Sequence, residues 1–371
     1  MPRRFHLIVK FLGLAICLGT APLNAQILQD TATLNLVKKD IDYIYNLQFN
    51  DAREVYTKII QVYPRHPIVF LLRGMINYWE NYPLTHTTPS HVSFEEDMRQ
   101  CIKASEANNN KDYEAEYLLA DLCARGFLLL FYADNELVME VIPLAISTYR
   151  YIRRSFKFAP VCTDLNYFTG VYNYYREAYP RAYPVYKSLA LLFPPGDMEK
   201  GLKELQTAAL NSVVLSAESY FLLSWICLGF ENNYPASLYY CKTLHEKYPG
   251  NLQYRATYIK NLLLMKLYDE AEKMISASSE HAGNNYYRAQ IAIFNGILQE
   301  KKYLDNKLAQ QYYKKGISEI AFFNGYGDEY AAYAYFGLSR ISEAGGEKHT
   351  GKIFRKEAMK LADFKKINFD K

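Results

Sequence analysis

Histidines, cysteines and carboxylates are the side chains of this sequence that could do chemistry, and their spacing decides which chemistry is open to them. Six histidines follow residue 25, but none belongs to the His-Glu-x-x-His pattern of a zinc helix, and no Cys-x-x-Cys pair occurs. His86 and His91 share one loop, where metal binding would be adventitious. We therefore expect no metal site.

Nucleotide binding and acyl transfer also leave local patterns. The sequence contains no P-loop, no Gly-x-Gly-x-x-Gly after a strand and no nucleophile elbow. Residues 324–328 (NGYGD) are expected to end one helix and start the next, and acidic pairs such as Glu95/Glu96 are expected to stabilise helix N-termini. The prediction is a protein with no cofactor and no catalytic residues, and not an enzyme. A hydrolase would instead need a polar pocket in which a histidine and a carboxylate meet.

The composition is that of a folded protein with an excess of tyrosine. Of the 371 residues, 50% are hydrophobic and 22% are charged, which excludes general disorder. The length exceeds that of most single compact cores, so we expect two domains or an elongated repeat. The 35 tyrosines suit both the seams between packed helices and a recognition surface.

Residues 1–25 have the layout of a signal peptide. Three basic residues precede the apolar stretch Phe11–Leu18, and Ala25 ends the predicted cleavage site. This stretch is too short to span a bilayer, and no later segment approaches the roughly 20 apolar residues of a membrane helix. We expect a soluble exported protein, periplasmic or extracellular. A lipid anchor on Cys17 is not expected, because Ile16 stands where a lipobox has a small residue.

Removal of this segment would take away three positive charges and lower the formal net charge from +4 to +1. No general attraction to nucleic acid or anionic lipid follows for the mature chain. The locally basic stretch from Lys352 to Lys371 is expected to belong to a solvated capping helix.

The cysteines after residue 25 are odd in number and lie in apolar helical segments, so we expect small core residues and no disulfide framework. Cys227 and Cys241 could face each other across one helix pair, which leaves their pairing open. The full set is Cys101, Cys123, Cys162, Cys227 and Cys241.

Apolar residues recur at helical spacing along almost the whole chain, so the sequence predicts an all-α protein. An internal repeat sharpens this prediction. Ser237, Cys241, Leu244 and Pro249 have the offsets 0, 4, 7 and 12 of the second helix in a tetratricopeptide unit. Ala271 starts the same frame 34 residues after Ser237, which is the period of that unit.

The repeat frame also occurs elsewhere in the chain. It starts at Ala52, and weaker copies start at Gly201, Ala309 and Gly351. A small residue lets paired helices approach to within about 8–10 Å, and stacking on a neighbour then covers the apolar flank of each pair. The predicted fold is a tetratricopeptide-like α-solenoid of antiparallel helix pairs. The alternative is an unspecialised helical bundle. The matching small residues of the first helices are Gly74, Gly170, Gly296 and Gly337.

Two proline-containing interruptions divide the predicted array. Residues 81–92 form a loop, and the SFEE sequence that follows at 93–96 matches a capping box. We interpret residues 179–196 as a proline-rich hinge between an N-terminal region of irregular helical repeats, 26–178, and a C-terminal repeat array, 197–371. Asp197 is expected to cap the next helix, and Pro143 predicts a break or kink inside a helix.

The segment LLFPPGDMEKGLKELQTAALNS carries a family resemblance. Its Gly196-Asp197, Gly201-Leu202 and Ala208 match a Gly-Asp, three residues, Gly-Leu, then Ala pattern. From about Glu114 to Ile275 the chain resembles bacterial tetratricopeptide-repeat proteins distantly similar to the eukaryotic tetratricopeptide-repeat-protein-39 group. The resemblance implies an α-solenoid without a catalytic centre and transfers no binding residues.

Recognition is the function that remains. The first helices of such a solenoid line a concave groove in which a peptide or helix can lie. We expect a scaffold that binds another protein or a peptide there; the alternative is a glycan-binding protein of the cell envelope, because aromatic rings also stack on sugars. In either case the same residues could instead pack between helices. The groove candidates are Tyr78, Trp79, Tyr167, Tyr174, Tyr175 and Lys260.

Overall fold

The computed structural model describes residue 27 and residues 30–277 and 283–362. Within these residues every regular element is a helix and no strand is formed, which confirms the all-α prediction. The predicted signal peptide lies outside the described residues. The elements are α2 (Thr31–Tyr45), α3 (Phe49–Val62), α4 (Pro67–Glu80), α5 (His91–Glu106), η1 (Lys111–Tyr113), α6 (Glu114–Asp134), α7 (Val138–Phe158), α8 (Leu165–Ala182), η2 (Pro184–Tyr186), α9 (Lys187–Ala190), α10 (Met198–Asn211), α11 (Ser216–Gly229), α12 (Tyr234–Lys247), α13 (Leu252–Leu264), α14 (Tyr268–Ser276), α15 (Asn285–Leu298), η4 (Gln299–Tyr303), α16 (Asn306–Ile320), η5 (Ala321–Phe323), α17 (Gly325–Ala344) and α18 (Lys348–Leu361).

Side-chain caps start several of these helices. The Asp197 carboxylate accepts the backbone N–H of Lys200 at 3.0 Å, so its predicted role as the cap of α10 is confirmed. The predicted capping box at 93–96 is wrong. The α5 helix begins at His91, because the turns that start at Thr88 and Pro89 run directly into it, and the Ser93 hydroxyl donates to the Ser90 carbonyl instead.

Two further local predictions have opposite outcomes. Of the break or kink predicted at Pro143, the break is absent, since α7 continues through this residue. Pro143 lies near the start of α7, so only the Met139 carbonyl, on a residue that is 83% exposed, loses its partner inside the helix. The prediction for residues 324–328 is confirmed, because Asn324 has a φ of 49° between η5 and the start of α17.

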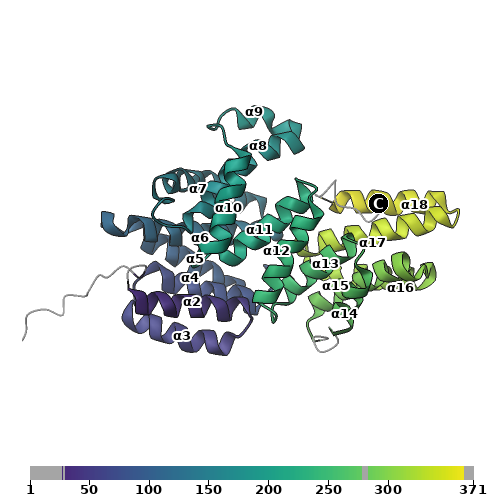
Figure 1. Ribbon diagram of the computed structural model, residues 1–371, viewed down its shortest axis with the longest axis horizontal. Coiled ribbons are helices and arrows are strands. Elements are labelled where there is room, and N and C mark those ends of the chain that lie inside the picture. The colour runs from purple at the N-terminus through teal and green to yellow at the C-terminus, as the bar shows by residue number, and fades with distance from the viewer. Residues whose placement is uncertain (1–26, 28–29, 278–282, 363–371) are drawn as a thin grey trace, which may run out of the picture.

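Helices that follow one another in sequence pack against each other along the chain (Figure 1). Helices of a pair approach each other closely at several of the predicted small residues. A Cβ on Gly201 would lie 2.8 Å from the Gly170 carbonyl oxygen, and a Cβ on Gly74 would overlap Met98. The pairs are α2–α3, α4–α5, α6–α7, α8–α10, α11–α12, α13–α14, α15–α16 and α17–α18.

The proline-rich segment, residues 179–196, lies within one packed helix pair. Residues 179–196 lie between α8 and α10, and these two helices form one tightly packed pair through Gly170 and Gly201. The segment also holds the end of α8 together with η2 and α9, so it is an insertion within a pair. The division into residues 26–178 and 197–371 with a hinge between them stays a prediction, and the close contact of α8 with α10 spans the proposed hinge.

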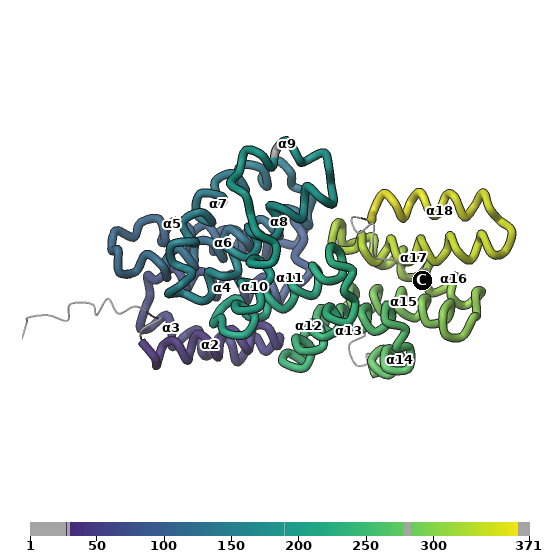
Figure 2. Tube along the Cα trace, turned by 45° about the horizontal axis from the view of Figure 1, so that its top comes forward, coloured from purple at the N-terminus to yellow at the C-terminus, as the bar shows by residue number. Residues whose placement is uncertain are grey.

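Distant parts of the chain close on one another. The end of α2 lies beside α12 and α13 in both views (Figures 1 and 2), and the Asn251 amide donates to the Tyr45 carbonyl at 2.9 Å. The Tyr326 hydroxyl donates to the Leu84 carbonyl at 3.1 Å, which ties α17 to the loop after α4. None of the described helices combines the length and apolar character needed to cross a bilayer.

Candidate functional site

The inner face, made by the first helices of the pairs, is filled by the protein's own aromatic rings. We call these rings the inner aromatic cluster. The Trp79 ring lies 5.7 Å from the Tyr45 ring and 5.6 Å from the Tyr254 ring, and the Tyr82 ring lies 5.6 Å from the Tyr326 ring. These contacts join α2, α4, α13 and α17, so they close the face where a ligand was expected. The cluster consists of Tyr45, Tyr78, Trp79, Tyr82, Tyr254, Tyr286 and Tyr326.

Four of the six groove candidates are buried. Tyr78 is 5% exposed, Trp79 is 8% exposed and Tyr174 is inaccessible, because rings of neighbouring helices cover them. Lys260 is 4% exposed and forms an ion pair with Glu329 of α17 at 2.7 Å. In this structure these four residues pack inside the protein, as the alternative given for each of them expects, and a role in ligand binding stays a prediction.

Tyr167 and Tyr175 are only half-buried. The Tyr167 ring packs edge-on against Phe168 at 5.2 Å, and the Tyr175 ring lies 5.4 Å from the Phe230 ring. The structure does not bring these two tyrosines together with the other candidates into one open groove.

A cleft lies between the second helices of two neighbouring pairs, α4–α5 and α6–α7. Helices α5 and α7 both pack on α6, and the space between α5 and α7 is open at two places. We call this space the α5–α7 cleft. The floor is α6, whose run LLADLCARGFLLL places Asp121 and Arg125 one turn apart within apolar residues.

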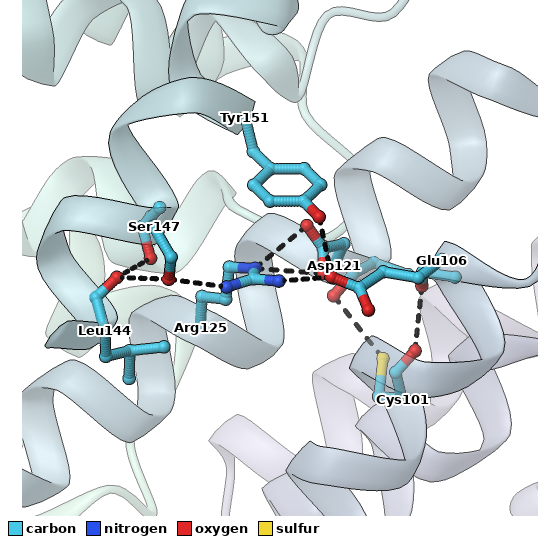
Figure 3. A network of polar contacts seen from close by, with 10 residues as sticks. Cys101, Glu106, Asp121, Arg125, Leu144, Ser147 and Tyr151 are labelled. Carbon is cyan, nitrogen blue, oxygen red and sulfur yellow. Dashed lines mark hydrogen bonds and ion pairs between the residues drawn. The ribbon is translucent and has the colours of Figure 1, made fainter. Parts of the chain in front are cut away.

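Arg125 bridges the walls of the cleft (Figure 3). Its guanidinium donates to Asp121 at 3.0 Å, to Glu106 of α5 at 2.9 Å and to Ser147 of α7 at 3.0 Å. The Tyr151 hydroxyl of α7 donates to the same Glu106 carboxylate at 2.6 Å. The Tyr151 ring also lies 4.2 Å from the guanidinium carbon, which is a cation–π distance.

Burial decides the electrostatics of this bridge. Arg125 is 5% exposed and Asp121 is 1% exposed. Burial raises the pKa of Asp121 to about 6, although the neighbouring guanidinium lowers it. Burial, together with the hydrogen bond to Glu106, also raises the pKa of the Tyr151 hydroxyl. At neutral pH the bridge is therefore a charged Asp121–Arg125 pair with a neutral tyrosine donor.

The bridge divides the cleft into two cavities of similar size but different chemistry. Cavity 1, of about 440 Å³, is polar and lies beside three consecutive asparagines, 108–110, with Lys111, Arg150 and Arg154 among its basic residues. Cavity 2, of about 420 Å³, has Ile102, Leu128 and Leu144 on its walls. One end of the cleft thus suits a polar or anionic group, and the other suits an apolar side chain.

A histidine and a carboxylate do meet elsewhere, but without room for a substrate. His66 Nε2 lies 3.0 Å from a Glu116 oxygen, and both side chains are 7% exposed. The space beside them holds only about 20 Å³, and Ile27, whose N–H donates to Glu116 at 3.2 Å, lines it together with other apolar residues. This pair has the geometry of a core contact.

The other reactive side chains have structural surroundings. His86 lies against Asn135, and the His91 ring lies 2.8 Å from the Thr88 carbonyl oxygen. Cys227 and Cys241 are both buried and free, like the other cysteines after residue 25. Across the described ranges, no group of three or more histidine, cysteine or acidic side chains is placed to hold a metal ion.

Sequence reasoning missed the α5–α7 cleft. The signal that could have found it is the charged pair Asp121 and Arg125 within an apolar helix, since buried charges require partners from neighbouring elements. No family model and no curated protein matches the chain, so the interpretation of the site rests on this geometry.

Proposed function

We propose that the protein is an exported, tetratricopeptide-like solenoid that binds a peptide segment of another protein in the α5–α7 cleft. Support for the repeat comes from helix pairs that approach closely at small residues of the predicted frame, such as Gly170 and Gly201. Export rests on residues 1–25, and N-terminal sequencing of the mature chain tests it: the predicted first residue is Gln26.

The observation that carries the binding proposal is a surface cleft with apolar residues at one end and, at the other, a polar cavity in which three basic and three acidic side chains meet. Apolar residues of cavity 2, Leu128 and Leu144, can bury one large apolar side chain of a ligand. In cavity 1, Arg150 has no carboxylate within 4.0 Å among the described residues, so its charge is available to an acidic side chain. The expected ligand is a peptide with an apolar residue and an acidic residue.

Panning of a random-peptide library on the purified protein tests this proposal. We expect enrichment of sequences that combine one large apolar residue with Asp or Glu. Arg150→Glu should abolish selection of the acidic position, and Leu144→Asp should abolish selection of the apolar position, because each change opposes the group that the corresponding cavity receives. Affinity of a selected peptide should fall by roughly tenfold or more for each variant, the loss expected for one desolvated contact.

Arg153→Glu is the matched control for Arg150→Glu, because Arg153 is exposed on the same helix but does not line either cavity. Selection of peptides without this pattern, or equal loss of binding in Arg150→Glu and Arg153→Glu, would remove the cleft from the proposal.

A glycan is the second candidate ligand. Tyr117 lines cavity 1 together with the asparagines 108–110, and its ring is stacked on the Tyr113 ring with the centroids 6.2 Å apart. Asparagine amides can hydrogen-bond sugar hydroxyls, and an aromatic face can stack on a sugar ring. Isothermal titration against a polysaccharide panel tests this. Heat that is lost in Tyr117→Ala but retained in Leu144→Asp would favour the glycan over the peptide.

A further inference from the structure

One face of α7 is exposed and changes character along its length. Three apolar residues at its N-terminal end are followed by three basic residues, all spaced three or four apart and thus on one line of the helix. Met139 is 83% exposed and Ile146 is 71% exposed, which is unusual for side chains of their size. The line consists of Met139, Ile142, Ile146, Arg150, Arg153 and Lys157.

The insertion between α8 and α10 stands beside this line. The Phe193 ring packs on the Tyr149 ring of α7 at 4.9 Å, and the Tyr172 hydroxyl of α8 donates to the Pro194 carbonyl at 2.7 Å. These contacts hold the exposed Leu191 and Leu192 next to α7, at 82% and 76% exposure. In Figure 1 the insertion, marked by α9, forms the outer edge of the molecule above α7 and α8.

The charge of this region differs from that of the rest of the mature chain. Residues 138–193 contain seven lysines and arginines but only three carboxylates, whereas the remainder after residue 25 has a slight excess of carboxylates. Asp164 is buried and accepts three backbone N–H groups, and Glu177 pairs with Arg176. Within the segment this leaves Glu140, and Glu114 of α6 pairs with Arg154 at 3.0 Å and lies 3.9 Å from Lys157. Arg150 and Arg153 have no carboxylate within 4.0 Å among the described residues.

Tyrosines complete the face. The Tyr179 ring lies 4.8 Å from Tyr183 and 5.2 Å from Tyr186, so the three form a cluster at the base of the insertion. Tyrosine is enriched where a protein meets a bilayer, since its ring is apolar and its hydroxyl is polar. Exposed apolar side chains, a tyrosine cluster and basic residues in one segment are together the composition of an interfacial membrane-binding surface.

We propose that this face, the α7–α9 face, docks on the surface of an anionic lipid bilayer. Leu191, Leu192 and Ile146 enter the interfacial layer, and Arg153 and Lys157 contact lipid phosphates. Leu144 and Ser147 point into cavity 2 from another side of α7, so docking leaves cavity 2 open. Arg150 also lines cavity 1 and is shared by the two surfaces, so the docking contacts are assigned to Arg153 and Lys157, which line neither cavity. Anionic lipid is the occupant that fits both the exposed apolar residues and the excess of positive charge.

Vesicle co-sedimentation tests the proposal with the purified protein, expressed with its own N-terminal segment so that processing is retained. We expect binding to phosphatidylcholine vesicles that contain phosphatidylglycerol, little binding to phosphatidylcholine alone, and loss of binding as salt is raised. Arg153→Gln combined with Lys157→Gln should weaken binding by about fivefold for each charge removed. Leu191→Asp combined with Leu192→Asp should abolish it, since charge at the tip opposes insertion.

Two controls match these variants elsewhere on the surface. Leu210→Asp changes a leucine that is 70% exposed on α10, and Lys314→Gln with Lys315→Gln removes two exposed charges from α16; neither should alter vesicle binding. Circular dichroism confirms that each variant is folded. Wild-type protein that ignores anionic vesicles, or control variants that lose as much binding as the α7–α9 variants, would overturn the proposal. If the wild-type protein binds a soluble protein but does not bind vesicles, the proposal is also overturned.

Discussion

Arg125 is the residue on which the α5–α7 cleft depends most, because its guanidinium contacts one side chain from each of the three helices that form the cleft. Arg125→Ala leaves the Asp121 carboxylate, which is 1% exposed, without its countercharge. We expect the free energy of unfolding to fall by about 3–5 kcal/mol, the usual result of breaking a buried ion pair.

Urea denaturation measures this change. Arg153→Ala is the control, since Arg153 is exposed and its loss should alter stability by less than about 0.5 kcal/mol. The double substitution Asp121→Leu with Arg125→Leu should recover much of the loss, because it removes both buried charges together. Equal stability of Arg125→Ala and the wild type would show that the bridge does not hold the cleft.

Asp40 sets a pH dependence of stability. Its carboxyl group is inaccessible, and burial raises its pKa to about 8. The folded protein thus favours the protonated form, whereas the unfolded chain ionises near the ordinary value of 3.8. The contribution of Asp40 to the free energy of unfolding therefore falls as the pH rises from 3.8 to about 8, and it is constant above that range.

Asp40→Asn removes this titration. Above pH 8 the variant should be more stable than the wild type by about 2–5 kcal/mol, and the difference should shrink as the pH falls through the range below it. Thermal unfolding at several pH values measures the effect. A constant difference at all pH values would mean that Asp40 is not protonated in the folded protein.

At the scale of the helix pair, glycine contacts decide how closely two helices approach. A Cβ on Gly201 would lie 2.7 Å from the Tyr174 nitrogen, and backbone at this distance cannot rotate away. Gly201→Ala should therefore destabilise the protein by about 1–3 kcal/mol. Gly126→Ala is the control, because nothing lies within 4 Å of the added Cβ. This change removes a glycine from the interior of α6, so we expect the free energy of unfolding to rise by up to about 1 kcal/mol.

Calorimetry compares the two alanine variants. Opposite signs of the change in melting temperature are expected from the same chemical substitution. A similar melting temperature for both would contradict the close approach of α8 and α10.

Features at this scale were largely predictable from the sequence, because they depend on neighbours in the chain. The repeat frame placed small residues at Gly170, Gly201 and Gly296, and the structure finds neighbouring side chains or backbone at each. The cap at Asp197 needs only the N–H three residues later. The helix break predicted at Pro143 does not occur. The energetic cost of a proline inside a helix depends on whether the carbonyl that loses its hydrogen bond can reach solvent, and a sequence pattern does not show this.

At the scale of the whole molecule, contacts between distant segments close the inner face. Asn251 is inaccessible, its amide nitrogen donates to Tyr45, and its oxygen caps α13. Asn251→Ala should cost about 2–4 kcal/mol, since it removes a cap and leaves a buried carbonyl unpaired. Asn233→Ala removes only an exposed cap of α12 and should cost about 1 kcal/mol. Chemical denaturation that gives equal losses would show that the closure adds nothing.

This closure is the part that the sequence could not supply. Tyr78, Trp79 and Lys260 stand at positions where an open solenoid exposes its first helices, and they are buried because segments about 200 residues apart, such as those of Tyr45 and Asn251, meet. No local spacing records such a contact. The α5–α7 cleft was missed for the same reason, since its walls come from α5 and α7 and its bridge from α6.

The location of the ligand site is the claim on which the functional account rests, and site-specific photocrosslinking tests it most directly. A photoreactive benzoylphenylalanine replaces either Ile102, which lines the α5–α7 cleft, or Tyr175, a half-buried candidate of the inner face. A peptide selected by panning should crosslink at position 102 and not at position 175. Crosslinking at position 175 alone would place the ligand on the inner face and contradict the account.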